Sequence, residues 1–343
     1  SRATRCSPAP YSAMSEWSGQ CQTQVQEPQV VSQASGLPVT FSLTPFEAFD
    51  PSQILVEPVD PIDSQFGHFG GRCLLLRNIL TPDECAYLVA EMSSGTAMEP
   101  VNYRIDYRRN DRCIFESGEL ADLLWCRVQP VAEALAIHVD VDLACQGLGQ
   151  PSAGGCPSEL QVGYGNEGFW KPVGLNECLR FCRYTPGGFF RPHCDATFRR
   201  SDEEMSLFTC MFYLDEGMGG GATRFLKIDA TMTCDNYLQL AREEEVLASL
   251  APATGSCLLF FQPGLLHEGE DLSWGVKHIL RTDVMFRREP GTKRARTDKE
   301  EEAWRLVQRA QALESAGSAH DCDEACQLYR RAFKLDPKLE RLL

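Results

Sequence analysis

The sequence of 343 residues lacks the positive charge that marks several classes of protein. It has 33 Lys and Arg against 48 Asp and Glu, so its formal net charge is −15. A protein that follows nucleic-acid phosphates needs a positive surface, and an anionic membrane attracts the same kind of surface. The charge therefore predicts no nucleic-acid partner and no attraction to an anionic membrane. It favours a neutral or basic substrate.

Long apolar runs and closely spaced cysteines are also scarce. The apolar run Cys257–Phe261 is far shorter than the ~18 residues of a membrane-spanning helix, so no membrane span is predicted. The chain has 16 cysteines and six histidines but no Cys-x-x-Cys motif, which disfavours a cysteine zinc cage. Scattered thiols are typical of a reducing compartment, so the composition favours the cytoplasm. A location in the lumen of the endoplasmic reticulum is the alternative if a leader precedes Ser1. The sequence does not decide whether any cysteines form a disulfide or what the oligomeric state is.

Composition divides the chain into four segments. Residues 1–60 are rich in Ser, Gln and Pro, which predicts a disordered or loosely packed arm. Residues 61–288 hold most of the apolar periodicity and predict one domain. The charged run 289–302 predicts a linker, and residues 303–343 have the apolar spacing of a helical hairpin. That hairpin resembles a single tetratricopeptide-type unit, which cannot bury its own apolar face, so we expect it to dock on the domain or on a protein partner.

Within residues 61–288 a short apolar strand at 72–76 precedes two helices, which are followed by five further strands. Thr81 and Glu84 form a capping box that begins a helix running through Met92. A second helical pattern follows Ser117, with Pro130 marking a break or a new start. From there on, short apolar runs are separated by Gly and Pro turns, which predicts antiparallel strands of a sandwich or barrel. The predicted strands are 179–184, 207–214, 222–226, 256–261 and 277–286, with an acidic insertion at 229–245. The fold class is therefore α+β, mainly β.

One group of residues has the spacing of a metal site. His193 and Asp195 are two residues apart, so they share one face of an extended segment. His267, which follows the predicted strand 256–261, is the candidate for a third ligand. Two histidines and one carboxylate are typical of non-haem Fe(II) oxygenases. Lys277, ten residues beyond His267, would supply a cation for a dicarboxylate beside the metal.

Other residues compete for these roles. His138 and Asp140 have the same spacing as His193 and Asp195 but lack the strand and turn around them, so we expect no metal there. His278 is a rival for the third ligand, yet it adjoins Lys277 in a strand and would face the opposite side. Arg281 shares the face of Lys277 and is the second candidate for the carboxylate anchor.

These motifs resemble the prolyl 4-hydroxylase-like branch of the 2-oxoglutarate and Fe(II)-dependent dioxygenases, over about residues 72–288. Tyr184 precedes His193 by nine residues, as in that family, and the run 220–225 is similar to the family's Gly-Gly turn. The interval from His267 to the lysine also agrees. The resemblance implies a double-stranded β-helix (jelly-roll, cupin-like) core with supporting N-terminal helices, followed here by the C-terminal helical hairpin.

The resemblance also implies roles for single residues. His193, Asp195 and His267 would bind Fe(II), and Lys277 would pair with the distal carboxylate of 2-oxoglutarate. Tyr184 would donate a hydrogen bond to the same carboxylate. Thr223 in the Gly-Gly turn is a weaker candidate for the co-substrate pocket, because a turn and strand role explains it better. No side chain beyond the metal site is expected to act in catalysis.

The implied reaction is hydroxylation of an unactivated C–H bond, with O2 and 2-oxoglutarate consumed and succinate and CO2 released. Ascorbate, if the protein uses it, would re-reduce the iron. A peptidyl proline or another protein side chain is the leading substrate, but Ser206 stands where collagen-type members usually have Arg. Arg199 and Arg200 are nearby and are candidate substitutes, although a role in a solvated loop explains them better. A free amino acid or small molecule stays open, as does a non-catalytic interaction protein that binds through its hairpin.

Overall fold

The protein is described by a computed structural model that covers residues 42–46, 48–62, 73–95, 98–139, 166–227, 238–262, 265–316 and 319–342. Residues 1–41 of the predicted arm, most of the predicted acidic insertion and Asp140 lie outside these described residues.

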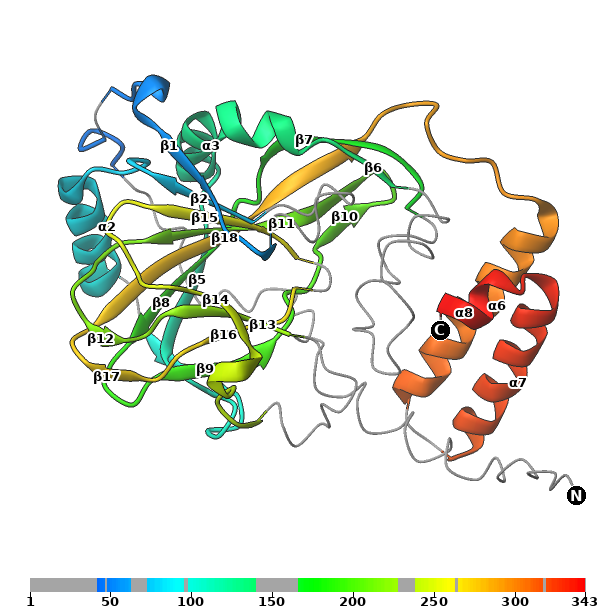
Figure 1. The fold of residues 1–343 in the computed structure, drawn as a ribbon. Helices are drawn as coiled ribbons and strands as arrows, with labels where there is room; N and C mark the ends of the chain where they lie inside the picture. The colour runs from blue at the N-terminus through cyan, green and yellow to red at the C-terminus, as the bar shows by residue number, and fades with distance from the viewer. Residues whose placement is uncertain are drawn as a thin grey trace, which may run out of the picture.

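Two β-sheets form the centre of the molecule (Figure 1). The larger sheet has the order β1 (Leu55–Pro58), β2 (Cys73–Arg77), β15 (Cys257–Phe261), β11 (Glu204–Tyr213), β18 (Lys277–Arg288), β8 (Cys178–Tyr184), β5 (Asp111–Glu116) and β3 (Glu99–Pro100). The smaller sheet has the order β14 (Val246–Leu250), β13 (Thr223–Leu226), β16 (His267–Gly269), β9 (Phe189–His193) and β4 (Arg108–Arg109). Phe225 and Phe260 pack edge to face with ring centroids 5.3 Å apart, so the sheets share one hydrophobic core. The arrangement is the double-stranded β-helix expected of this mainly β chain, and each of the five predicted strands is present.

Shorter strands extend these sheets at their margins. Strand β7 (Gly168–Leu175) pairs with β18 and also with β6 (Ile137–Val139), and β10 (Arg199–Ser201) pairs with β11. Strands β12 (Gly219–Gly220) and β17 (Leu272–Trp274) form a separate pair. The 3-10 turns are η2 (Pro51–Gln53), η4 (Glu133–Leu135) and η6 (Glu243–Glu245).

Two helices lie against the strand assembly, as predicted. Helix α2 (Pro82–Gly95) begins with the expected capping box: the Glu84 amide donates to Thr81 Oγ1 at 3.2 Å, and the Thr81 amide donates to Glu84 Oε2 at 2.8 Å. Helix α3 (Gly118–Ala132) continues through Pro130, which is no break. A proline in the last turn removes only one backbone hydrogen bond, so the helix tolerates it.

The predicted arm and linker need correction at their inner ends. Leu55–Pro58 forms the edge strand β1, which pairs with β2. All four of its side chains are exposed, so it lacks the apolar alternation that would have revealed it. Helix α6 (Asp298–Ala316) begins inside the predicted linker because Thr297 and Glu300 form a second capping box.

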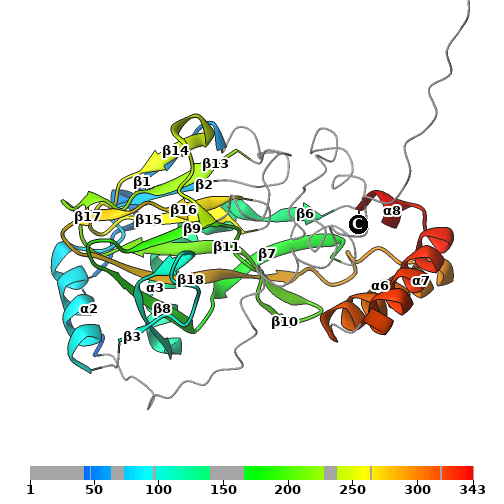
Figure 2. The ribbon, with the colours of Figure 1, turned by 90° about the horizontal axis from the view of Figure 1, so that it is seen from below.

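The C-terminal helices pack on one another beside the strand assembly (Figures 1 and 2). Helix α7 (Ala319–Leu335) follows α6, and the short helix α8 (Lys338–Leu342) was not predicted. Ala303, Val307, Ala332 and Leu339 form a buried cluster among these helices. The hairpin therefore buries some apolar side chains of its own with the help of α8, which corrects the premise that it cannot, while its docking on the domain or on a partner stays a prediction. Its tetratricopeptide likeness stays a prediction.

The structure bears on the cysteines and on membrane spans only within the described residues. The cysteines there are free thiols. Among these residues the structure has no helix with the length and apolar character needed to cross a membrane.

Candidate metal centre

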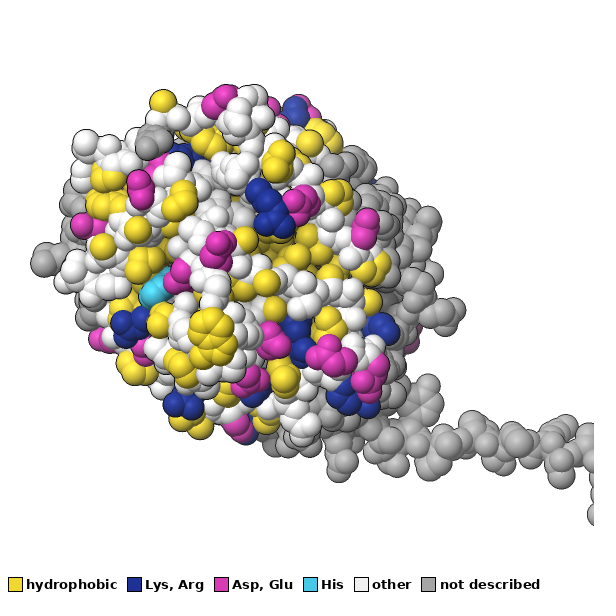
Figure 3. Space-filling view, turned by 60° about the vertical axis from the view of Figure 1, so that its left-hand side comes forward, with side chains coloured by type: hydrophobic (Ala, Val, Ile, Leu, Met, Phe, Trp, Pro, Cys, Tyr) yellow, Lys and Arg dark blue, Asp and Glu magenta, His cyan; other side chains and the backbone are white. Residues whose placement is uncertain are grey.

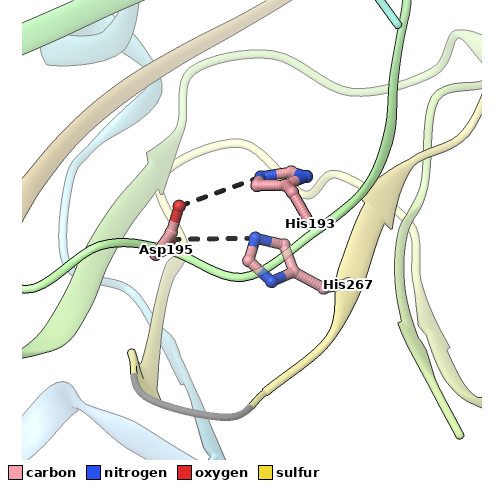
Figure 4. Close-up of side chains that lie close together, drawn as sticks. All are labelled: His193, Asp195 and His267. Atoms are coloured by element: carbon pink, nitrogen blue, oxygen red, sulfur yellow. Dashed lines mark ion pairs between the residues drawn. The ribbon is translucent and has the colours of Figure 1, made fainter. Parts of the chain in front are cut away.

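The pairing of β9 with β16 brings His193 and His267 together. His193 ends β9, His267 begins β16, and the two are directly opposite in the antiparallel register. Opposite residues of such a pair project to the same face of the sheet, and the two imidazole centroids are 4.2 Å apart. Asp195 follows β9 by two residues, and Figure 4 shows all three side chains pointing toward one another.

The donor atoms of these residues are close enough to share one ion. Asp195 Oδ1 lies 3.8 Å from His193 Nε2, and Asp195 Oδ2 lies 3.7 Å from His267 Nε2. His193 Nδ1 is 2.8 Å from the Arg191 carbonyl oxygen, and His267 Nδ1 is 2.9 Å from the Leu265 carbonyl oxygen. A carbonyl only accepts, so each Nδ1 carries the proton and each Nε2 presents its lone pair. Within the described ranges this is the group of side chains that could hold a metal.

Electrostatics prepare the same atoms for a divalent cation. Burial lowers the pKa of His193 well below its usual value, and the neighbouring His267 adds to the effect. Burial also lowers the pKa of His267, so both imidazoles are neutral at pH 7. Burial alone would raise the pKa of Asp195, but the Arg281 guanidinium, the two imidazoles and the Thr209 hydroxyl together outweigh it and hold that pKa far below its usual range. Two neutral imidazoles and one ionised carboxylate fit Fe(II).

The Asp195 carboxylate has two neighbours that orient it. Thr209 of β11 donates a hydrogen bond to Oδ2 at 2.6 Å, and Arg281 Nη2 lies 2.9 Å from Oδ1. Thr209 is a site residue that the sequence did not reveal, because every residue of β11 after its first is buried and no alternation distinguishes it. Arg281 was predicted as a second anchor beside Lys277. Its contact with Asp195 instead places it at the metal end.

Lys277 and Tyr184 line the same cavity as the three candidate ligands. They are opposite one another in the register of β18 and β8, and Lys277 Nζ lies 5.4 Å from the centre of the Tyr184 ring. Burial lowers the pKa of Lys277 to about 8 and raises that of Tyr184 to about 12. At pH 7 both groups therefore keep their protons and are donors for a carboxylate.

The Gly-Gly turn shapes the wall near Lys277. Lys277 Nζ donates to the Gly221 carbonyl oxygen at 2.6 Å. Gly221 has φ of 75°, and a Cβ there would lie 2.9 Å from Leu272 Cδ1, so only glycine suits the position. Thr223 also lines the cavity, but its Oγ1 accepts a hydrogen bond from the Tyr213 hydroxyl at 2.7 Å. Its place in β13 agrees with the turn and strand role.

Arg108 is a cavity residue that the sequence did not single out. It is 4% exposed, and its guanidinium lies 4.1 Å from the centre of the Phe190 ring. Phe190 in turn stacks on His193 with centroids 3.5 Å apart. Nothing in the local pattern around Arg108 marks it, since β4 is only two residues long.

The rival candidates lie elsewhere. His278 faces away from the cavity, stacks on Phe181 and contacts Asp215 through Nδ1 at 2.5 Å. Ser206 is fully buried and donates to Gln262 Oε1 at 2.7 Å, so it does not replace an arginine at the cavity. Arg199 donates to Asn166 Oδ1 at 2.5 Å, and neither it nor Arg200 lines the cavity. The side chains of His138 and Asp140 lie outside the described residues.

Comparisons with known proteins agree with this geometry. Residues 179–282 match the family model of the 2OG-Fe(II) oxygenase superfamily, which confirms the predicted resemblance at that level. The matched segment holds the three candidate ligands, Lys277 and Tyr184. A search of curated proteins finds no match.

A search of solved structures returns matches that include two prolyl hydroxylases and one epimerase. A Pseudomonas putida prolyl-4-hydroxylase is 17% identical, with 66% of this chain and 97% of that chain covered at a TM-score of 0.39. A viral collagen prolyl hydroxylase from Paramecium Bursaria Chlorella virus-1 is 17% identical, with 63% of this chain and 96% of that chain covered at a TM-score of 0.35. The non-heme alpha ketoglutarate dependent epimerase SnoN from nogalamycin biosynthesis is 14% identical, with 68% of this chain and 90% of that chain covered at a TM-score of 0.38.

Proposed function

We propose that the protein is a 2-oxoglutarate- and Fe(II)-dependent dioxygenase that hydroxylates a C–H bond, with succinate and CO2 as the other products. The observation that carries the proposal is the meeting of His193, Asp195 and His267 in one cavity with a buried lysine. A charged ammonium inside a protein is costly unless an anion joins it. Lys277 has no acidic partner among the described ion pairs, so a bound carboxylate would complete its surroundings.

The chain's own residues would prepare the reaction. Fe(II) held by the three ligands would supply the redox chemistry that O2 and 2-oxoglutarate require. Lys277 and Tyr184 would bind the distal carboxylate and fix the direction of the co-substrate in the cavity. Phe190 and Phe260 lie against His193 and His267, with ring centroids 3.5 and 4.8 Å away, and would keep bulk water from the metal side.

A protein or peptide side chain is the proposed substrate, with a peptidyl proline as the first candidate because the motifs resemble prolyl 4-hydroxylases. One observation favours a second candidate, a small molecule or free amino acid. The side chain of Ser206 is buried and donates to Gln262, so this position supplies no arginine for a collagen-type proline. Ascorbate as reductant belongs to the same proposal.

A turnover assay tests this function. Fe(II)-loaded protein is incubated with 2-oxoglutarate, ascorbate and a panel of proline-containing peptides and free amino acids. Succinate and a mass gain of one oxygen are measured. We expect one class to gain oxygen in step with succinate, and Asp195→Ala to abolish both signals. If a His193→Ala variant retained the turnover, the metal centre would not be the site of reaction. A non-catalytic interaction protein would give no succinate in any arm.

A further inference from the structure

Strand β18 presents a row of side chains to the metal cavity. Lys277, Ile279 and Arg281 all line the cavity, because alternate residues of a strand face the same side. The row has a cation at each end and an apolar side chain between them. A co-substrate with a carboxylate at each end of a short carbon chain has the complementary order of groups.

The two cations face different ends of the cavity. Lys277 is held near the Gly-Gly turn through its hydrogen bond to Gly221. Arg281 Nη2 lies 2.9 Å from Asp195 Oδ1 and 3.8 Å from Asp283 Oδ1, so its guanidinium is anchored beside the metal ligand. The strand thus separates a distal cation from a cation at the metal.

Arg281 has donor capacity beyond these contacts. A guanidinium carries five N–H groups in a planar fork, which suits a carboxylate through two parallel hydrogen bonds. Arg281 Nε is buried and has no hydrogen-bond acceptor in the part of the chain that the structure describes. Nε and Nη2 share one edge of the fork, so the unused donor is adjacent to the one that contacts Asp195. A buried donor without an acceptor is costly and indicates a ligand that completes it.

We propose that Arg281 binds the metal-proximal carboxylate of 2-oxoglutarate while Lys277 binds the distal one, so that β18 holds the co-substrate at both ends. This rests on the proposed function: a carboxylate bound at the metal end of the cavity would lie within reach of the guanidinium that contacts Asp195. Ile279 then contacts the methylene carbons between the two charged ends.

Calorimetric titrations with two ligands test the assignment. Protein saturated with Ni(II), with the metal content measured, is titrated with 2-oxoglutarate and with 2-oxopentanoate, which has the same chain without the distal carboxylate. Arg281→Gln should weaken both ligands by a similar factor, about 10- to 100-fold for a charge-assisted contact. Lys277→Met should weaken 2-oxoglutarate and leave 2-oxopentanoate unchanged. Arg287→Gln, an exposed arginine on the same strand, is the control and should change neither.

Two other results of these titrations would overturn the role of Arg281 or the proposed function. If metal-saturated Arg281→Gln binds 2-oxopentanoate as the parent protein does, Arg281 does not bind the proximal carboxylate. Arg281→Lys keeps the charge and should weaken both ligands less than Arg281→Gln. If Arg281→Gln cannot be loaded with metal, Arg281→Lys takes its place: unchanged binding of 2-oxopentanoate by Arg281→Lys would then overturn the role of Arg281. If the parent protein itself binds neither ligand, the proposed function fails together with this inference.

Discussion

Asp195 is held at both of its oxygen atoms before any metal binds. Thr209 donates to one oxygen and Arg281 contacts the other, while the two histidines are fixed through Nδ1. Side chains held in this way need little rearrangement when an ion enters, and neighbours of this kind commonly tune metal affinity. The candidate site is thus organised by side chains and carbonyl groups outside the three candidate ligands.

Thr209 should contribute measurably to metal affinity. Thr209→Val keeps the shape of the side chain and removes the 2.6 Å hydrogen bond to Asp195. We expect the dissociation constant for Fe(II), measured anaerobically against a chelating dye, to rise about tenfold. Thr209→Ser retains the hydroxyl and should bind nearly as the parent does. Equal affinity for all three proteins would show that the hydrogen bond does not orient the ligand.

Lys277 should make co-substrate binding sensitive to pH. Burial lowers its pKa to about 8, and only the protonated ammonium attracts a carboxylate. Affinity for 2-oxoglutarate should therefore be constant below pH about 8 and fall by up to tenfold per pH unit above it, because deprotonation then competes with binding. Calorimetry of Ni(II)-loaded protein between pH 7 and 9.5 measures this.

A matched variant isolates the lysine. Lys277→Arg replaces it with a group that stays protonated throughout this range, so its affinity should not fall above pH about 8. A decline of the same size in both proteins would assign the titration to another group.

Spacing in the sequence was enough to select most residues of the candidate site. His193, Asp195 and Lys277 follow from the period of a strand and from short intervals along the chain, and the structure brings them into one cavity. The contact of Arg281 with Asp195 was not predictable in this way. It depends on how β18 lies in the sheet relative to Asp195, and intervals along the chain do not encode that.

At the scale of the elements, β13 and β16 are joined by a buried ion pair next to the metal site. Arg224 and Glu268 are opposite in the register, are 3% and 0% exposed, and approach to 2.5 Å. Glu268 directly follows the candidate ligand His267. Burial raises the pKa of Glu268, so the carboxylate depends on the arginine for its charge. The pair therefore fixes the strand that carries one candidate ligand.

Breaking that pair should destabilise the fold. Arg224→Met leaves a buried carboxylate without its cation, and we expect the free energy of unfolding in urea to fall by about 3–5 kcal/mol. Replacing both partners with Met should recover most of the loss, since no lone charge remains. Arg242→Met removes an exposed pair with Glu245 and should cost less than about 1 kcal/mol. A loss for Arg224→Met as small as this control would contradict a structural role.

Elements with a local signal were predictable, and those that depend on distant partners were not. The capping box of Thr81 and Glu84 located helix α2 to its first turn. Strand β1 escaped notice because an edge strand is held by backbone hydrogen bonds to β2 and its side chains are exposed. Helix α6 had an equally clear capping box at Thr297, which the charged composition around it obscured.

For the whole molecule, net charge is a poor guide to the cavity. Acidic and basic side chains are interspersed over the face drawn in Figure 3, with no single patch of either sign. The chain has a net charge of −15, but basic side chains outnumber acidic ones in the lining of the cavity. The lining includes the basic residues Arg108, Arg180, Lys277 and Arg281 and the acidic residues Asp195 and Glu268. A preference for neutral or basic substrates, expected from the net charge, therefore does not extend to groups that enter the cavity. The cavity suits anionic groups.

The metal dependence of 2-oxoglutarate binding tests the central claim most directly. Metal-free protein and protein loaded with Ni(II) are titrated with 2-oxoglutarate in the same calorimeter. We expect binding at one site per chain only when metal is present, loss of binding in Asp195→Ala, and no change in Glu57→Ala on the exposed edge strand β1. Binding that does not depend on the metal, or its survival in Asp195→Ala, would contradict the proposed site.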